Sequence, residues 1–364
     1  MTDHAIANWF SRPGDTIRTM MERRGISAQH LADHVEGGLA RVRGLLDGSQ
    51  RVDARTALRL SEVVGATEKF WLKRQENFDA AVERAVSQVS ATEPEDLLLS
   101  IPAPGDKPRG KLSAERRTEE IRRRLVFFNV PNMECYASRY GKLISNTDFR
   151  KSNTFATKDD ATLLWLRRGE LESDLVATKA WNPAVLREKL PSICKLSRLG
   201  RPAVFIPRLR EQLAEAGVAL VIVKAPKGCT ASGASRMVDA DKAMLLVSFR
   251  YRSDEQFWFT IFHEIGHLLL HKAHTFVDAP STPLDDKERE ANEFAARCIV
   301  PENRMSEFER IGHDKDSIVR FSVSVGVAAG LIVGQMQHRK MLPQEKMNGV
   351  KRTWTWEQID PALI

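Results

Sequence analysis

The sequence predicts an α+β protein that is predominantly helical and is organised in two domains. Residues 13–85 carry apolar side chains at helical spacing, which predicts an all-α N-terminal domain within residues 1–90. Residues 91–125 are rich in Pro and Gly and then basic, which predicts a linker. A β-branched run at residues 218–224 is followed by two amphipathic helices that carry His and Glu, so residues 201–345 are expected to combine helices with a small mixed sheet.

Composition narrows the class of protein further. The chain has 364 residues, of which 42% are hydrophobic, enough for two buried cores. Its four cysteines include no C-x-x-C pair, so the sequence indicates neither a disulfide framework nor a Cys-based zinc site. The chain start lacks the features of a signal peptide, and the apolar run at residues 323–334 is too short to span a bilayer. We therefore expect a cytoplasmic protein that does not act in the membrane.

The N-terminal domain is expected to contain five helices. The first starts at Pro13, the second after the N-cap Ser27, the third after the Gly37-Gly38 turn and the fourth after Asp53. A pair of helices joined by a tight turn in this way is the plan of a helix-turn-helix domain, whose later helix enters the major groove of DNA.

The fifth helix carries the motif Phe70-Trp71, Gln75 and Phe78-Asp79. With it, residues 13–82 resemble the HigA-type (Xre-like) antitoxin family, and this resemblance implies DNA binding. The third helix departs from the family pattern, because its first residues, 38–40, offer no hydrogen-bond donors to base edges.

Arginines in this domain remain available for phosphate contacts. They are Arg41, Arg43, Arg51 and Arg55. The first 90 residues hold 13 Lys and Arg against 12 Asp and Glu, a difference of only +1. Two interpretations therefore stay open for the N-terminal domain: it contacts DNA, or it serves for homodimerisation and partner docking.

Residues 107–200 contain no motif that indicates catalysis or ligand binding. Residues 107–124 hold 8 Lys and Arg against 3 Asp and Glu, a pattern more typical of the solvated face of a helix than of a nucleic-acid surface. Residues 126–200 are expected to form a helical scaffold, with helices over 159–175 and 182–194.

The C-terminal domain is expected to begin with a helix over 208–216 and strands over 218–224, 235–238 and 243–249. The last of these strands is predicted to be a docking edge for an extended peptide. Helices follow over 302–311, 317–325 and 328–341, and Trp354 and Trp356 are expected to anchor the tail, residues 346–364.

The central motif is HExxH at residues 263–267. Two histidines four residues apart lie side by side on a helix, so His263 and His267 can bind one zinc ion, while Glu264 is placed as a general base. Residues 253–256 have the S-x-x-Q form of a capping box at the start of this helix. Apolar residues at helical spacing are expected to bury its back; they are Phe257, Ile261, Ile265 and Leu268.

A third protein ligand is needed for a catalytic zinc site. A third histidine six residues after His267 is absent, because Ala273 stands there. The helix predicted over residues 285–300 offers Glu288, which continues a stripe of small residues, whereas Glu290 points off that stripe. We therefore predict Glu288 as the third ligand, with Asn292 within reach of a ligand histidine.

These paired motifs, HEIGHLLLH followed by EREANEFAARCIVP, resemble the ImmA/IrrE family of zinc metallopeptidases over roughly residues 200–345. The resemblance implies a gluzincin-like domain with one Zn²⁺ per chain, Glu264 as base, and His263, His267 and Glu288 as ligands. It also implies limited proteolysis of a repressor-like, helix-turn-helix protein, which relieves repression in a stress, mobile-element or toxin-antitoxin setting.

Two questions stay open at this point. Three side chains are candidates for stabilising the oxyanion: His271, His338 and Tyr251. The alternative function is an antitoxin-like, DNA-binding repressor whose zinc domain is a sensor or scaffold without cleavage.

Overall fold

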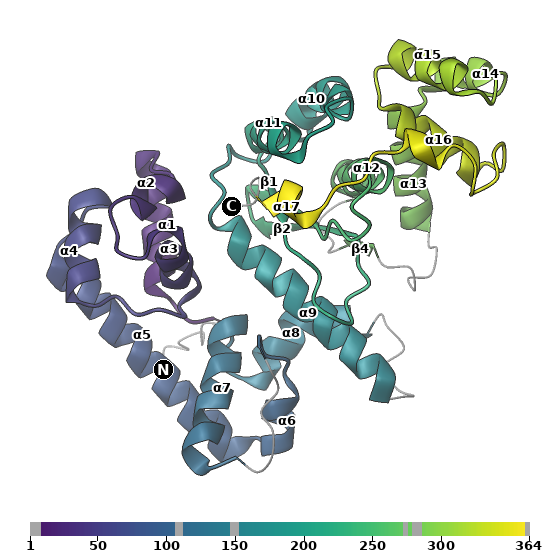
Figure 1. Ribbon diagram of the computed structural model, residues 1–364. Helices are drawn as coiled ribbons and strands as arrows, with labels where there is room; N and C mark the ends of the chain where they lie inside the picture. Colours follow the sequence, from purple (N-terminus) through teal and green to yellow (C-terminus); the bar gives the residue numbers. More distant parts are fainter. Residues whose placement is uncertain (1–8, 106–111, 146–152, 272–275, 279–285, 361–364) are drawn as a thin grey trace. The chain divides into compact units, whose positions relative to one another are not determined.

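Most of the protein is helical, and its strands form one small mixed sheet, as the sequence predicts. The computed structural model describes residues 9–105, 112–145, 153–271, 276–278 and 286–360. Its elements belong to two units (Figure 1). The N-terminal unit spans residues 1–177 with 226–229, and the C-terminal unit spans 178–225 with 230–364. The predicted scaffold segment 126–200 is therefore divided between the two units.

The N-terminal unit is all-helical among its described residues. Its helices are α1 (Pro13–Arg24), α2 (Ala28–Ala32), α3 (Gly38–Asp47), α4 (Ala54–Val63), α5 (Glu68–Thr92), α6 (Glu95–Ser100), α7 (Ala114–Phe128), α8 (Met133–Ser145) and α9 (Asn153–Ser173). The five helices predicted for residues 13–85 are present as α1 to α5, and α9 covers most of the helix predicted over 159–175.

The long helix α5 is fixed to the preceding helices by the residues of its motif. Trp71 is fully buried, and its indole N–H donates to the carbonyl oxygen of Gly65 at 2.8 Å. The Gln75 side chain accepts a hydrogen bond from the backbone N–H of Val52 at 2.9 Å. Because buried donors and acceptors must be satisfied, these two hydrogen bonds give Trp71 and Gln75 a structural role: they hold α5 against the segments before it.

The segment 91–125 is not a linker where it is described, because it contains α6 and α7. Helix α7 packs against α5 and buries Ile121, Leu125 and Phe128. Arg124 from the basic run is also buried, and its guanidinium donates to the carbonyl oxygen of Ile101 at 2.8 Å. Pro94 stands at the N-cap of α6, and Pro102 and Pro104 lie between α6 and α7, so these prolines interrupt neither helix.

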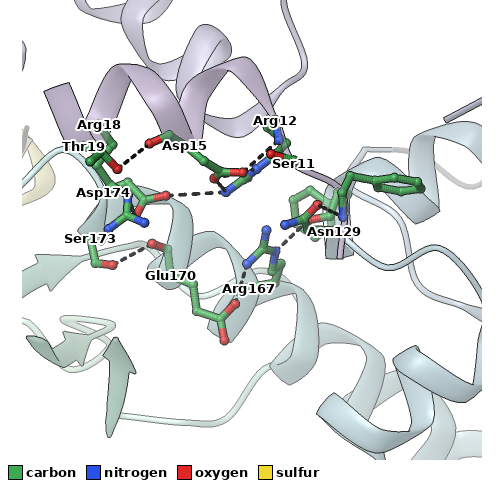
Figure 2. Close-up of polar contacts among 12 residues, drawn as sticks. Ser11, Arg12, Asp15, Arg18, Thr19, Asn129, Arg167, Glu170, Ser173 and Asp174 are labelled. Atoms are coloured by element: carbon green, nitrogen blue, oxygen red, sulfur yellow. Dashed lines mark hydrogen bonds and ion pairs between the residues drawn. The ribbon is translucent and has the colours of Figure 1, made fainter. Parts of the chain in front are cut away.

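A buried polar network connects α1 with the end of α9 inside the N-terminal unit (Figure 2). Arg12, the N-cap residue of α1, pairs with Asp15 at 2.7 Å and lies 4.0 Å from Asp174. Arg167 on α9 pairs with Glu170 at 2.6 Å. Arg12, Arg167 and Glu170 are each more than nine-tenths buried, and each has an oppositely charged partner, because an unpaired charge would be costly to bury.

The C-terminal unit combines helices and the sheet around one apolar core. Its helices are α10 (Pro183–Leu196), α11 (Pro202–Glu215), α12 (Asp254–Leu270), α13 (Asp286–Ile299), α14 (Met305–Phe308), α15 (Lys315–Val325), α16 (Ala329–His338) and α17 (Trp356–Ile359). Two 3-10 turns, η1 (Glu302–Arg304) and η2 (Asn348–Val350), complete it. The helix predicted over 302–311 is thus only η1 and α14.

The sheet has the order β1-β3-β2-β4. Its strands are β1 (Val218–Ile222), β2 (Gly233–Asp239), β3 (Lys242–Val247) and β4 (Phe276–Asp278). Strand β3 lies parallel to β1, with Leu220 opposite Leu245, and antiparallel to β2. The predicted peptide-docking edge at residues 243–249 is therefore wrong, because both sides of β3 are already paired.

The tail is part of the C-terminal core rather than a separate segment. Trp354 is buried and donates from its indole N–H to the carbonyl oxygen of Gly200 at 2.8 Å. Trp356 packs against the same core, with the ammonium of Lys224 5.0 Å from its ring centre. The predicted anchoring by both tryptophans is confirmed.

Among the described residues, no single helix has the length and apolar character needed to cross a membrane. Helices α15 and α16 satisfy that test only as a pair, by length and composition, and the chain bends by 109° between them.

Candidate metal centre

Helix α12 carries the HExxH motif through the middle of the C-terminal unit (Figure 1). Phe257, Ile261 and Ile265 are buried on its core side, as their spacing predicts, and Leu268 is half-buried against the same core. The helix packs against β2, β3, α13 and α16. Because α12 is held on several sides, the two histidines one turn apart have a rigid support.

The start of α12 differs from the prediction. Ser253 is the N-cap residue, but its side chain makes no capping hydrogen bond. The tail replaces that cap: the backbone N–H of Asp254 donates to the carbonyl oxygen of Arg352 at 2.9 Å, and the Arg352 N–H donates to the Asp254 carboxylate at 3.0 Å. The Asp254 carboxylate also accepts from the backbone N–H of Glu255. Burial raises the pKa of Asp254 to about 6, against the opposing effect of these backbone hydrogen bonds.

Helix α13 approaches α12 closely because small residues meet at their contact. A methyl group on Gly266 would lie 3.3 Å from the Cα atom of Ala291. Ala291 and Ala295 are fully buried. This close approach brings the first turn of α13, with Glu288, to the histidines of α12.

The side chains of His263, His267 and Glu288 converge. The two Nε2 atoms lie 2.9 Å apart, and the Glu288 carboxylate oxygens lie 3.2 Å from His263 Nε2 and 3.3 Å from His267 Nε2. Ligand atoms about 2.0–2.1 Å from a tetrahedral zinc ion are separated by roughly 3.3 Å. The donor set and its spacing therefore fit one zinc ion, and within the described part of the chain this is the group of His, Cys, Asp and Glu that could hold a metal.

The surroundings of the cluster favour a neutral His267 and an ionised Glu288. His263 and His267 are 2% and 1% exposed. Burial lowers the pKa of His267, so its ring tends to be neutral, although the hydrogen bond to Glu288 opposes this. Burial also opposes the charge on Glu288, but hydrogen bonds from both histidines outweigh it and lower the pKa of this carboxyl to about 2.

Each histidine has a different partner on its Nδ1 atom. His263 Nδ1 lies 3.0 Å from the Asn292 side-chain oxygen, the contact expected for this residue. His267 Nδ1 lies 3.1 Å from His271 Nδ1, and His271 Nε2 lies 2.9 Å from the Glu290 carboxylate. Both ring nitrogens of His271 are thus engaged, one with a predicted ligand and the other with Glu290.

The other two oxyanion candidates, Tyr251 and His338, are both exposed. Tyr251 is 49% exposed in the turn before α12, with the Arg250 guanidinium against its ring. His338 is exposed at the end of α16.

Glu264 is fully buried beside the cluster, and Gly233 of β2 lies against it. A methyl group at Gly233 would stand 2.4 Å from Glu264 Oε1 and 2.6 Å from Thr260 Cγ2. Sequence reasoning missed Gly233, because its role depends on how β2 crosses α12. It also assigned no role to Glu290, which contacts His271. The spacing of His267 and His271, four residues apart on one helix, was a signal that these two rings meet.

The arginines predicted to contact DNA all take part in ion pairs within the N-terminal unit. Their acidic partners, for Arg41, Arg43, Arg51 and Arg55 in that order, are Asp53, Glu172, Asp79 and Glu36. Arg41 and Arg55 also line a groove of about 630 Å³ that carries Asp33 among its acidic side chains. This surface is mixed in charge rather than uniformly basic.

Comparison with known proteins bears on the segment that contains the cluster. Residues 220–330 match the family Peptidase_M78, the IrrE N-terminal-like domain. The match supports a relationship to the ImmA/IrrE family over this IrrE-like segment and suggests a metallopeptidase, whose metal is commonly zinc. The three converging side chains and Glu264 all lie inside the IrrE-like segment. No curated protein matches the chain.

Proposed function

We propose that the chain is a zinc-dependent endopeptidase that cleaves a protein substrate at the cluster of His263, His267 and Glu288. The observation that carries the proposal is the convergence of these three donor side chains next to the buried carboxylate of Glu264. A metal site kept only for folding has no need of a second carboxylate that can act as a general base.

The roles of the residues follow from their chemistry. His263, His267 and Glu288 hold the metal, which when bound supplies Lewis acidity toward the scissile carbonyl. Glu264 takes a proton from the attacking water and returns it to the departing amine. Its full burial strengthens its electrostatic interactions with the reacting atoms.

The substrate we propose is a repressor-like, helix-turn-helix protein, and cleavage relieves repression in the cytoplasm. In this proposal the N-terminal unit directs the peptidase to its site of action by binding DNA, a partner or a second copy of the chain. The alternative, a DNA-binding repressor without cleavage, is less favoured because residues 38–40 at the start of α3 offer no side-chain hydrogen-bond donors to base edges, and because such a repressor has no use for the buried carboxylate of Glu264.

The Glu264→Gln variant tests the proposal. It is expected to retain zinc, since the metal ligands are unchanged, and to lose cleavage by at least about 100-fold, the usual contribution of a general base. Purification of this variant from its host is expected to trap the substrate, whose cleavage by the wild type is then followed by mass spectrometry. Cleavage by the variant at the wild-type rate rules out the base, and the absence of any cleavage by the wild type favours the repressor alternative.

A further inference from the structure

The contacts behind His267 extend beyond its immediate neighbour. His271, the C-cap residue of α12, lies between the Nδ1 atom of His267 and the carboxylate of Glu290 on α13. We propose that His271 and Glu290 form a positioning relay that fixes the ring orientation and tautomer of His267, and that Glu290 thereby sets the affinity of the site for zinc. This inference rests on the proposed function of the cluster.

The direction of the hydrogen bonds in the relay follows from the cluster. His267 Nε2 faces His263 Nε2 and Glu288, so Nε2 is the ligand atom and the ring proton must be on Nδ1. That N–H then donates to His271 Nδ1, which leaves the proton of His271 on Nε2. His271 Nε2 in turn donates to the Glu290 carboxylate at 2.9 Å. The opposite direction requires a proton on His267 Nε2 and is incompatible with metal binding.

The relay is built differently from the support of His263. His263 donates directly to the neutral side-chain oxygen of Asn292 at 3.0 Å. The relay on His267 ends on a carboxylate instead, and a hydrogen bond to an ionised acceptor is roughly twice as strong as one between neutral groups. We therefore expect Glu290 to polarise the His271 ring and, through it, to increase the electron-donating strength of His267.

The different exposures of His271 and Glu290 indicate that Glu290 acts on the cluster through its hydrogen bond to His271. The His271 side chain is 5% exposed, whereas the Glu290 side chain is 58% exposed. Water screens the field of such an exposed carboxylate, so its influence on the cluster has to pass through the hydrogen bond to the buried imidazole. Glu290 is thus a positioning residue, while Glu288, two residues earlier on the same helix, is a ligand.

The experiment measures zinc affinity of the full chain by competition with a chromogenic chelator. His271→Ala and Glu290→Ala are each expected to weaken zinc binding by about 10- to 100-fold, the usual effect of removing a hydrogen-bond partner of a metal ligand. Glu290→Gln keeps an acceptor oxygen and is expected to recover most of that affinity. Glu293→Ala is the matched control, because Glu293 is exposed on the same helix and pairs with Arg297.

A second readout separates positioning from general loss of structure. In the zinc-loaded wild type, the Nδ1–H of His267 is expected to give a downfield proton resonance in NMR spectra, which shifts in Glu290→Ala and is unchanged in Glu293→Ala. Zinc affinity of Glu290→Ala equal to that of the wild type overturns the relay. If the wild type itself binds no zinc, the proposed function fails, and this outcome is distinct from a relay that fails in a zinc-binding protein.

Discussion

Replacing Gly233 by Ala perturbs the proposed base without touching a metal ligand. The added Cβ would lie 2.4 Å from Glu264 Oε1, whereas ordinary contact begins at 3.4 Å, so the carboxylate has to move by about 1 Å. A displacement of this size costs on the order of 100-fold in rate. We therefore expect kcat for cleavage of the trapped substrate to fall about 100-fold with zinc content unchanged, and stability to fall by about 1–3 kcal/mol from overpacking.

The matched control for this prediction is Gly349→Ala. A methyl group at Gly349 meets nothing within 4 Å, so this variant adds the same atoms to the same unit without a clash. It is expected to cleave at the wild-type rate. The reasoning is refuted if Gly233→Ala cleaves as fast as Gly349→Ala while both carry zinc, because Glu264 then tolerates the displacement or does not act as the base.

Three further predictions concern a buried carboxyl, the hydrogen-bond partner of a predicted metal ligand and a buried ion pair. Burial raises the pKa of Asp254 to about 6, so this carboxyl lowers the free energy of unfolding as pH rises from about 4 to about 6. The Asp254→Asn variant has no carboxyl to ionise and does not show this loss. Its stability relative to the wild type is therefore expected to improve by up to about 3 kcal/mol between pH 4 and pH 7. Denaturant unfolding at both pH values measures this, and an unchanged difference contradicts it. Asn292→Ala is expected to weaken zinc binding about 10-fold by removing the acceptor of His263, and wild-type affinity in the chelator assay argues against that role. Arg167→Met leaves Glu170 without its closest buried cation and is expected to cost about 3–5 kcal/mol in denaturant unfolding, whereas a loss below 1 kcal/mol means that other partners satisfy Glu170.

Sequence patterns predicted the elements whose contacts are local. The apolar spacing on residues 257–268 predicted the buried face of α12, and the small residues that follow Glu288 predicted the close approach of α13. Both follow from helical periodicity alone. This is why the three converging side chains could be selected before their positions in space were known.

Features that depend on distant segments could not be predicted in this way. The order of the sheet placed β3 between two strands, and nothing in residues 243–249 records that pairing. The cap of α12 comes from Arg352, almost a hundred residues away, so the local capping pattern at Ser253 was misleading. The close contact of Gly233 with Glu264 arises likewise from two segments that meet only in the fold.

Zinc stoichiometry of the purified full chain tests the central claim most directly. The cluster predicts one zinc ion per chain in the wild type and in Glu264→Gln, and loss of that ion in His263→Ala and in Glu288→Ala. A wild type without zinc, or a His263→Ala variant that still holds one ion as tightly as the wild type, contradicts the account.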